Sequence, residues 1–338
     1  MKYREESRAT EPYRIKFRDG IEKIIEDKQR EAEESRKKYF HDYFSKPEEY
    51  REDFKKMLGW PLCCERPTTE PKVNTKKLAE EEICTIYRMS FEVLEGLEMT
   101  GLFFEKDTGK KMPFIIAQHG AGGTPEGIAG LYDGDTKNYN DMVERVLKCG
   151  ANVFAPQTLR WSVEDENVPF DRNATDARLK RVGSSIAAIE LYGMMRILDY
   201  FEKQDYVSSF GMVGLSYGGF CTLFLAAVDD RIKSAIACAS FNDRDKYARA
   251  DWSWNKSAHK FSDAEVACMV YPRRLCIEVG IHDTLFSYAY AEKEIERLRT
   301  LNKFTDMKWL DIIAFAGEHE FCKDDLPVER MINDLTKN

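Results

Sequence analysis

The chain has 338 residues, of which 43% are hydrophobic and 33% are charged. This composition supplies a sizeable buried core, and it excludes disordered and collagen-like chains. The 59 acidic residues outnumber the 51 basic ones and give a net charge of -8, so we expect no nucleic-acid partner. The length alone is compatible with one domain or with two.

The sequence also bears on compartment. No apolar run approaches the roughly 18 residues needed to cross a bilayer, and the charged N-terminus lacks the apolar region of a signal peptide. The nine cysteines are scattered and include no Cys-x-x-Cys. Such a set is typical of reduced, mostly buried thiols. We therefore expect a cytoplasmic protein that does not bind membranes.

Residues 1–60 differ from the rest of the chain in their density of charged side chains. Between Arg14 and Leu58, apolar residues recur at helical spacing, which predicts two or three amphipathic helices. Pro47 suits the first turn of the last helix, and Gly59 suits its C-terminal stop. We expect the helices to lay their apolar stripes on the main domain. A self-association arm that builds a homo-oligomer is the alternative.

Residues 61–80 contain three prolines and few apolar groups, which predicts an extended linker before a domain of residues 81–338. That domain opens with a hairpin pattern, and strand and helix patterns then alternate. This order predicts an α/β fold with a mostly parallel central sheet and helices on both faces. The expected strands are 83–93, 97–105, 112–118, 151–155, 209–214, 233–239, 275–279 and 307–313, and the expected helices are 139–149, 184–202, 217–228 and 287–301.

The sharpest motif is Gly-Leu-Ser-Tyr-Gly-Gly at residues 214–219, between an expected strand and an expected helix. In that setting Gly-x-Ser-x-Gly forms a nucleophile elbow, a turn that holds the serine in a strained backbone conformation. Ser216 is therefore the candidate nucleophile, and an ordinary glycine-rich connector is the alternative. Serine is a poor nucleophile near neutral pH, so it needs a base and a carboxylate that orients the base.

Candidates for both groups follow the last two expected strands. Of the five histidines, His319 comes directly after the last strand, at the carboxyl edge of the sheet where active sites of open α/β folds collect. Asp283 lies on the loop after the preceding strand and is chosen as the acid over Glu278, which falls within that strand. His282 is a competing base that we interpret as structural.

An ester hydrolase also needs backbone donors for the oxyanion. The N–H of Tyr217 begins the helix after the nucleophile, where free N–H groups and the helix dipole favour an anion. The second donor is expected in the run His119-Gly-Ala-Gly-Gly after a central strand, with Ala121 as the first choice and Gly122 as the second. No metal or organic cofactor is required, and no Cys/His set has zinc spacing.

These residues resemble the α/β-hydrolase superfamily from about residue 80 to the end of the chain. The order Ser216, Asp283, His319 is that of the superfamily. The short motifs are most similar to the acetyl xylan esterase and cephalosporin deacetylase branch, with its dienelactone-hydrolase and prolyl-oligopeptidase relatives. The resemblance implies hydrolysis of carboxylic esters, often of small acyl groups on sugars. The chain departs from dienelactone hydrolases, which carry cysteine in place of Ser216, and it lacks the oligopeptidase propeller.

Two expected inserts, 157–176 and 241–270, follow strand ends and should overhang the nucleophile. Their tryptophans are candidates to stack on a sugar ring, and the anchoring of long loops is an equal alternative. Arginines of the first insert are candidates to hold a uronic carboxylate, although surface solvation is commoner. The candidate substrate-binding residues are Trp161, Arg160, Trp252 and Trp254, and the other arginines are Arg172, Arg178 and Arg181.

The sequence thus predicts a serine ester hydrolase, specifically a carbohydrate acetyl esterase that works through an acyl-enzyme without a cofactor. The polar inserts favour a short acyl group on a polar alcohol over a fatty-acyl ester. Three alternatives remain: a glucuronoyl-ester hydrolase, a peptidase or amidase of the same fold, and a catalytically silent binding protein.

Overall fold

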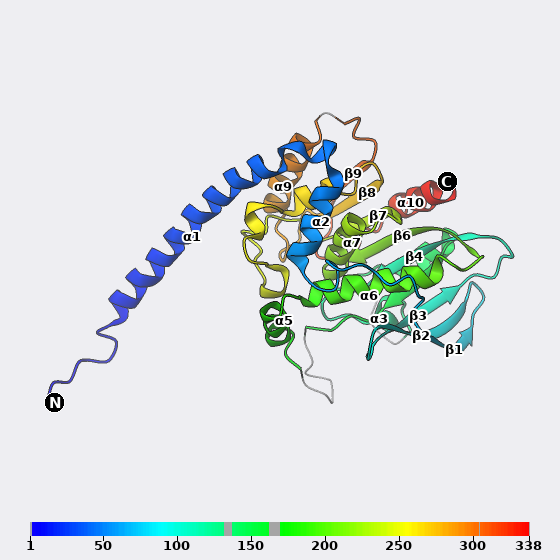
Figure 1. Cartoon of the computed structure of the whole chain (residues 1–338), viewed down its shortest axis with the longest axis horizontal. Coiled ribbons are helices and arrows are strands. Elements are labelled where there is room, and N and C mark those ends of the chain that lie inside the picture. The colour runs from blue at the N-terminus through cyan, green and yellow to red at the C-terminus, as the bar shows by residue number, and fades with distance from the viewer. Residues whose placement is uncertain (1, 132–136, 162–169, 304, 338) are drawn as a thin grey trace.

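The computed structural model describes residues 2–131, 137–161, 170–303 and 305–337. Within these ranges, nine strands form a single sheet at the centre of the main domain (Figure 1). In chain order they are β1 (Val73–Glu80), β2 (Thr85–Leu94), β3 (Leu97–Glu105), β4 (Met112–Gln118), β5 (Asn152–Pro156), β6 (Val207–Leu215), β7 (Ile232–Cys238), β8 (Arg274–Gly280) and β9 (Leu310–Phe315).

The sheet is mostly parallel. Its order is β1-β2-β3-β5-β4-β6-β7-β8-β9, and the six strands β5, β4, β6, β7, β8 and β9 run parallel to one another. The leading strands β1, β2 and β3 pair antiparallel with one another, and β3 pairs antiparallel with β5. The predicted fold class, a mostly parallel sheet with an antiparallel lead-in and helices on both faces, is confirmed.

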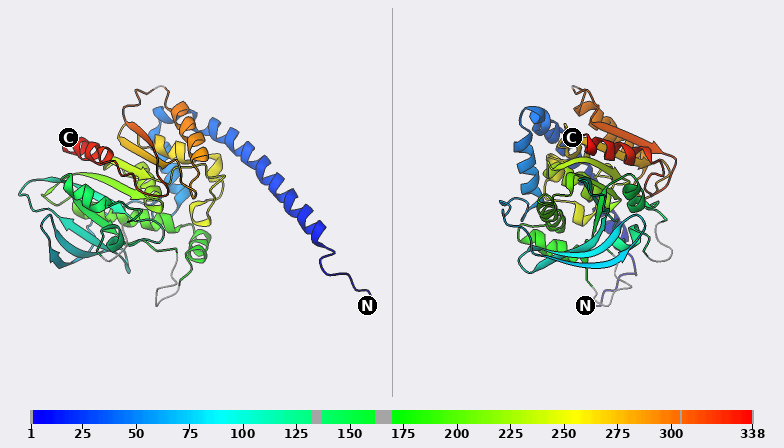
Figure 2. Two further views of the ribbon diagram at one scale, coloured as in Figure 1. Left: turned by 180° about the vertical axis from the view of Figure 1, so that it is seen from behind. Right: turned by 90° about the vertical axis from the view of Figure 1, so that its right-hand side faces the viewer.

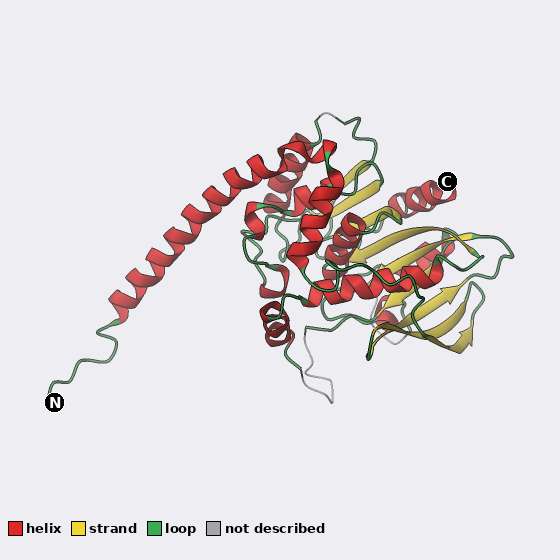
Figure 3. Ribbon diagram, viewed as in Figure 1, coloured by secondary structure: helices red, strands yellow, loops and turns green. Residues whose placement is uncertain are grey.

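Helices cover both faces of the sheet (Figure 3). In chain order they are α1 (Glu11–Tyr39), η1 (Phe40–Ser45), α2 (Pro47–Leu58), α3 (Pro125–Ile128), α4 (Met142–Lys148), α5 (Arg172–Arg181), α6 (Ile186–Phe201), α7 (Tyr217–Val228), η2 (Ala250–Trp252), η3 (Ser257–His259), α8 (Asp263–Cys268), α9 (Tyr288–Leu301) and α10 (Leu326–Thr336). One core cluster joins the sheet to α2, α6, α7, α8 and α9, and a second joins its other face to α3, α4 and α10.

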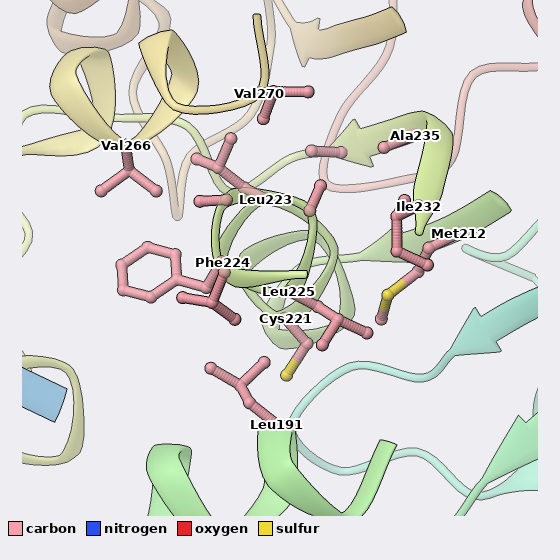
Figure 4. Packing of buried hydrophobic residues seen from close by; sticks show 14 of the residues in the cluster. Leu191, Met212, Cys221, Leu223, Phe224, Leu225, Ile232, Ala235, Val266 and Val270 are labelled. Atoms are coloured by element: carbon pink, nitrogen blue, oxygen red, sulfur yellow. The ribbon is translucent and has the colours of Figure 1, made fainter. Parts of the chain in front are cut away.

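Helix α7, which follows the candidate nucleophile, is buried along its whole length because its sequence is apolar on every side. Its side chains pack against Met212 and Ile232 of the sheet, against Leu191 of α6 and against Val266 of α8 (Figure 4). This packing fixes the start of α7, and therefore the turn that precedes it, rigidly on the sheet.

The second half of the N-terminal extension docks on the domain as expected. Helix α2 begins at Pro47 and ends before Gly59, whose φ of +101° favours glycine. Phe54 and Leu58 are fully buried against the domain, and Tyr43 of η1 packs in the same core.

The first half of the extension does not dock. Helix α1 projects away from the domain in Figure 1 and in the left view of Figure 2, and its only buried residues are Ala32 and Arg36 near its C-terminal end. The expectation that its apolar stripe lies on the main domain is therefore wrong for residues 11–31. At about 1.5 Å per residue this helix of 29 residues is about 44 Å long, and only its C-terminal turns lie on the domain.

The expected linker of residues 61–80 also needs correction. Residues 73–80 form β1, an edge strand paired antiparallel with β2 over most of its length. Most of its side chains are exposed, so the segment lacks the apolar pattern by which a strand is recognised in a sequence. Backbone pairing with β2, rather than side-chain burial, accounts for this strand.

Among the described residues, no helix combines the length and the hydropathy that a bilayer span requires.

Candidate active site

The candidate nucleophile lies at the carboxyl end of β6, in the turn that leads into α7. Ser216 has φ 62° and ψ -119°, a conformation that non-glycine residues rarely adopt and that functional sites often hold under strain. The glycines around it are required by space. A Cβ added at Gly218 would lie 2.0 Å from the Gln118 carbonyl oxygen, and one at Gly214 would lie 2.3 Å from that of Gly218. The predicted strand-turn-helix setting of the elbow is present.

The structure brings the predicted histidine and acid together. The Nδ1 of His319 and the Oδ2 of Asp283 are 2.8 Å apart. The other carboxylate oxygen, Oδ1, accepts the backbone N–H groups of Leu285 and Phe286, each at 2.8 Å. The Phe286 ring also stacks on the imidazole, with centroids 5.5 Å apart and 13° between the planes. The imidazole is thus held from two sides, and its Nε2 is the nitrogen left to serve the nucleophile.

The predicted oxyanion loop lies directly against the nucleophile. A Cβ added at Gly120 would lie 3.3 Å from the Cβ of Ser216. The Gly120 N–H donates to the Tyr139 hydroxyl at 2.9 Å, which fixes the loop. The N–H groups of Ala121 and Gly122 donate to no other residue in the described ranges, and the same holds for Tyr217 N–H. All three candidate donors therefore remain available to an oxyanion.

His119 fixes the oxyanion loop through hydrogen bonds of its imidazole ring. It is fully buried, its Nδ1 is 2.7 Å from the Gly120 carbonyl oxygen, and its Nε2 accepts the Thr158 N–H at 3.2 Å. Nδ1 must therefore carry the proton. Burial lowers the pKa of His119 to about 4, so the ring is neutral at ordinary pH. It joins the oxyanion loop to the segment after β5.

Arg172 does not have the exposed, substrate-facing position that the sequence allowed for it. Both of its terminal nitrogens bind Glu190, at 2.9 Å each, and its Nε binds Asp251, also at 2.9 Å. Burial by itself lowers the pKa of Arg172, but the charge of Glu190 raises it above the usual range. A buried guanidinium already paired with two carboxylates is not available to a uronic acid.

The cluster around Arg172 instead fixes the residue next to the nucleophile. The Tyr217 hydroxyl lies 2.6 Å from Arg172 Nη2 and also donates to Glu190. Glu190 in turn accepts the Leu159 N–H at 2.9 Å. Sequence reasoning missed Glu190. The available signal was one acidic residue in the otherwise apolar first half of helix α6.

The other predicted substrate-binding residues lie in two different environments. Trp161 and Arg160 border the oxyanion loop, because the Trp161 N–H donates to the Ala121 carbonyl at 3.0 Å and Arg160 Nε donates to that of Gly122 at 3.1 Å. The Arg249 guanidinium covers Trp161, 3.6 Å from the ring centroid. Residues 162–169, which hold much of the acidic run in the first insert, lie outside the described residues.

The two tryptophans of the second insert are placed differently. Trp252 is only 4% exposed and stacks on Phe220, with centroids 4.8 Å apart and 12° between the planes. Its indole faces lie in the core and offer no surface to a sugar, which corrects that expectation in favour of loop anchoring. Trp254 is half-buried and stacks on Phe224 with centroids 6.1 Å apart. The remaining arginines, Arg178 and Arg181, are exposed on or at the end of α5.

Glu278, the acid that the sequence placed second, is buried inside β8 and does not contact the histidine. Its Oε2 accepts the Cys322 N–H at 3.4 Å, just beyond the loop that carries His319, and its Oε1 has no partner among the described residues. Burial raises the pKa of Glu278 to about 7. The carboxyl is therefore mostly protonated below neutral pH.

This burial predicts a pH-dependent stability. Because the folded pKa lies above the ordinary value, Glu278 stabilises the fold fully at low pH, and this contribution is lost as the pH rises through 7. Glu278→Gln keeps the shape and removes the titration. We expect the unfolding free energy of Glu278→Gln, relative to wild type, to increase by about 2 to 3 kcal/mol between about pH 5 and about pH 8. Urea titrations at the two pH values measure the difference.

The exposed Glu318, in the same loop region, is a matched control, and Glu318→Gln should follow the wild-type pH profile. Parallel profiles for wild type and Glu278→Gln would contradict the prediction.

The described part of the chain contains no group of three or more His, Cys, Asp or Glu side chains arranged to hold a metal ion.

No protein-family model matches the chain. The curated protein "Putative hydrolase YtaP" of Bacillus subtilis (strain 168) is 25% identical over 252 residues, which cover 70% of this chain and 81% of that protein. A glucuronoyl esterase from Solibacter usitatus superposes with a TM-score of 0.61 at 13% identity, covering 87% of this chain and 93% of its own. An acetyl xylan esterase from Paenibacillus sp. R4 superposes with a TM-score of 0.58 at 14% identity, and the match covers 86% of this chain and 92% of that esterase.

The two solved esterases are of the α/β-hydrolase type, and at such low identity their likeness to this chain shows the fold alone. The chain has the α/β-hydrolase fold that the motifs predicted.

Proposed function

We propose that this chain is a serine carboxylic-ester hydrolase that removes short acyl groups from carbohydrates. The observation that carries the proposal is the joint geometry of the site. Ser216 is held in a strained elbow, a Cβ added at Gly120 of the oxyanion loop would lie only 3.3 Å from the Ser216 Cβ, and His319 is paired with Asp283 at 2.8 Å. A protein that only binds a ligand has no need of all three arrangements.

The mechanism is a two-step acyl transfer. Nε2 of His319 takes the Ser216 proton as the serine oxygen attacks the ester carbonyl, and the N–H groups of Tyr217 and of Ala121 or Gly122 stabilise the oxyanion. Asp283 keeps the proton on Nδ1 and stabilises the imidazolium. The alcohol leaves with a proton from His319, and water activated by the same histidine then releases the acid. The chain's own residues supply every group in this scheme.

The surroundings of the site support this substrate class. Arg160 and Trp161 border the oxyanion loop, and the Arg249 guanidinium covers Trp161, so these groups offer polar and aromatic contacts. Such a surface suits a sugar alcohol and a small acyl group. Similarity to a structure named as an acetyl xylan esterase supports the same class.

Initial rates on esters of graded chemistry test the proposal. The panel is 4-nitrophenyl acetate, butyrate and octanoate, acetylated xylo-oligosaccharide, a benzyl ester of glucuronic acid and 4-nitroacetanilide as the matched amide. We expect the acetate and the acetylated sugar to be hydrolysed fastest and the octanoate and the anilide to be nearly inert.

Other rankings would overturn part or all of the proposal. Preference for the glucuronate ester would replace the acyl-group assignment and keep the serine mechanism, and fast anilide hydrolysis would indicate an amidase. No turnover, combined with no labelling by a fluorophosphonate, would mean that Ser216 is not activated and that the protein is a binder.

A further inference from the structure

Residues 11–31 of α1, here called the arm, carry an apolar face that the rest of the chain leaves uncovered. Phe17 is 73% exposed and Ile24 60% exposed, and the remaining members are also exposed. Their spacing of three and four residues places them along one side of the helix. The members of this face are Tyr13, Phe17, Ile21, Ile24 and Ile25.

The body of the protein does not support the arm. Helix α1 contacts η1 and η3 through its C-terminal turns, while the arm extends away from the domain in Figure 1 and in the left view of Figure 2. An isolated helix of this kind gains no tertiary packing, from which most helical stability in proteins derives. A contiguous exposed apolar face of five large side chains is typical of an interaction surface.

The charges of the arm are segregated along its length. Residues 11–18 contain three basic and one acidic side chain, whereas residues 19–31 contain five acidic and three basic ones. The arm is therefore positive towards its N-terminus and negative towards the body. This polarity is complementary to itself when a second arm lies in the opposite direction.

We propose that the arm is a dimerisation element that pairs antiparallel with the arm of a second copy of this chain. Aligning Ile21 of one copy with Ile24 of the other buries the apolar faces against each other around a two-fold axis. The same alignment places Arg14 of each copy in one layer with Glu31 of the other, so that the positive end of each arm lies along the negative end of its partner. A parallel pair would instead oppose like charges at both ends.

Sedimentation equilibrium of the full chain tests the proposal. We expect the wild type to have twice the chain mass of 39.2 kDa at micromolar concentration. The double variant Ile21→Glu/Ile24→Glu should weaken the dimer by roughly 100-fold or more, because it places charges in the apolar contact. Ile15→Glu is the matched control, since Ile15 is 44% exposed on the opposite side of the same helix and its substitution should leave the dimer intact.

A charge reversal tests the direction of pairing. Arg14→Glu/Arg18→Glu should weaken the antiparallel dimer, whereas a parallel pair would keep like charges opposed and remain unchanged. Added salt should likewise weaken the wild-type dimer. The thermal transition of the main domain serves as the check that each variant is folded, because the substituted residues Arg14, Arg18, Ile21 and Ile24 are all exposed.

Three results would overturn the proposal. They are a wild type that is monomeric at every concentration reached, a dimer that survives Ile21→Glu/Ile24→Glu, and an Arg14→Glu/Arg18→Glu variant that dimerises as tightly as the wild type. In the first case, binding of the monomer to phosphatidylglycerol vesicles that is lost in Ile21→Glu/Ile24→Glu would assign the face to a membrane surface instead.

Discussion

Replacing Ser216 with alanine is expected to lower kcat/KM for 4-nitrophenyl acetate by roughly 10⁴-fold or more while leaving the fold intact. The loss is large because the nucleophile forms the acyl-enzyme, and no other group of the site can take that role. The turn itself should survive, since it is held by the Ser216 N–H, which donates to the Cys238 carbonyl at 2.9 Å, and by the glycines around it. Steady-state rates and thermal unfolding of the purified variant measure the two effects.

Ser240 provides the matched control. It is a buried serine close to the elbow, because a Cβ at Gly219 would lie 2.7 Å from its Oγ, and that Oγ has no hydrogen-bond partner among the described residues. Ser240→Ala should therefore retain activity near that of the wild type. If Ser216→Ala kept a tenth or more of the wild-type rate, ester hydrolysis would have to proceed through another nucleophile.

The second large effect is expected for Asp283→Asn, which should lower kcat by roughly 10³ to 10⁴-fold with a small change in KM. An asparagine amide can donate a hydrogen bond to His319 Nδ1, and this selects the tautomer whose proton lies on Nε2. That nitrogen can then no longer accept the serine proton. The asparagine oxygen can still accept the N–H groups of Leu285 and Phe286, so the loop should keep its shape.

Two neighbouring acids make this prediction specific. Glu318 is exposed beside His319 in the sequence and Glu278 is buried in β8, and neither contacts Nδ1. Glu318→Gln and Glu278→Gln should both keep most of the wild-type kcat. An active Asp283→Asn together with an inactive Glu278→Gln would transfer the orienting role to Glu278.

The buried cluster of Arg172, Glu190 and Tyr217 explains how the candidate oxyanion donor, the Tyr217 N–H, is kept in place. The Tyr217 side chain extends from the residue that follows the nucleophile and is held by two charged groups that are themselves paired. A cluster of this kind is costly to assemble, because both charges lose their water. It also resists movement, which is the property that an oxyanion hole requires.

The sequence by itself determined the fold class and the three candidate catalytic residues, for a local and a topological reason. The strand-turn-helix around Ser216 is a local pattern, and the carboxyl ends of parallel strands necessarily meet at one edge of the sheet. Asp283 and His319 therefore come together at 2.8 Å once the strands are placed correctly. Their pairing could be predicted without knowledge of any side-chain contact.

The tertiary structure alone decided which charged and aromatic side chains are free. Arg172 and Trp252 look like surface groups in the sequence, yet one is neutralised by Glu190 and the other is covered by Phe220, partners far away along the chain. The arm shows the converse. Its apolar face has the pattern of a docked helix, but the domain ends before the helix does. Whether a face is covered depends on surfaces that fold from distant segments, and local periodicity carries no information about them.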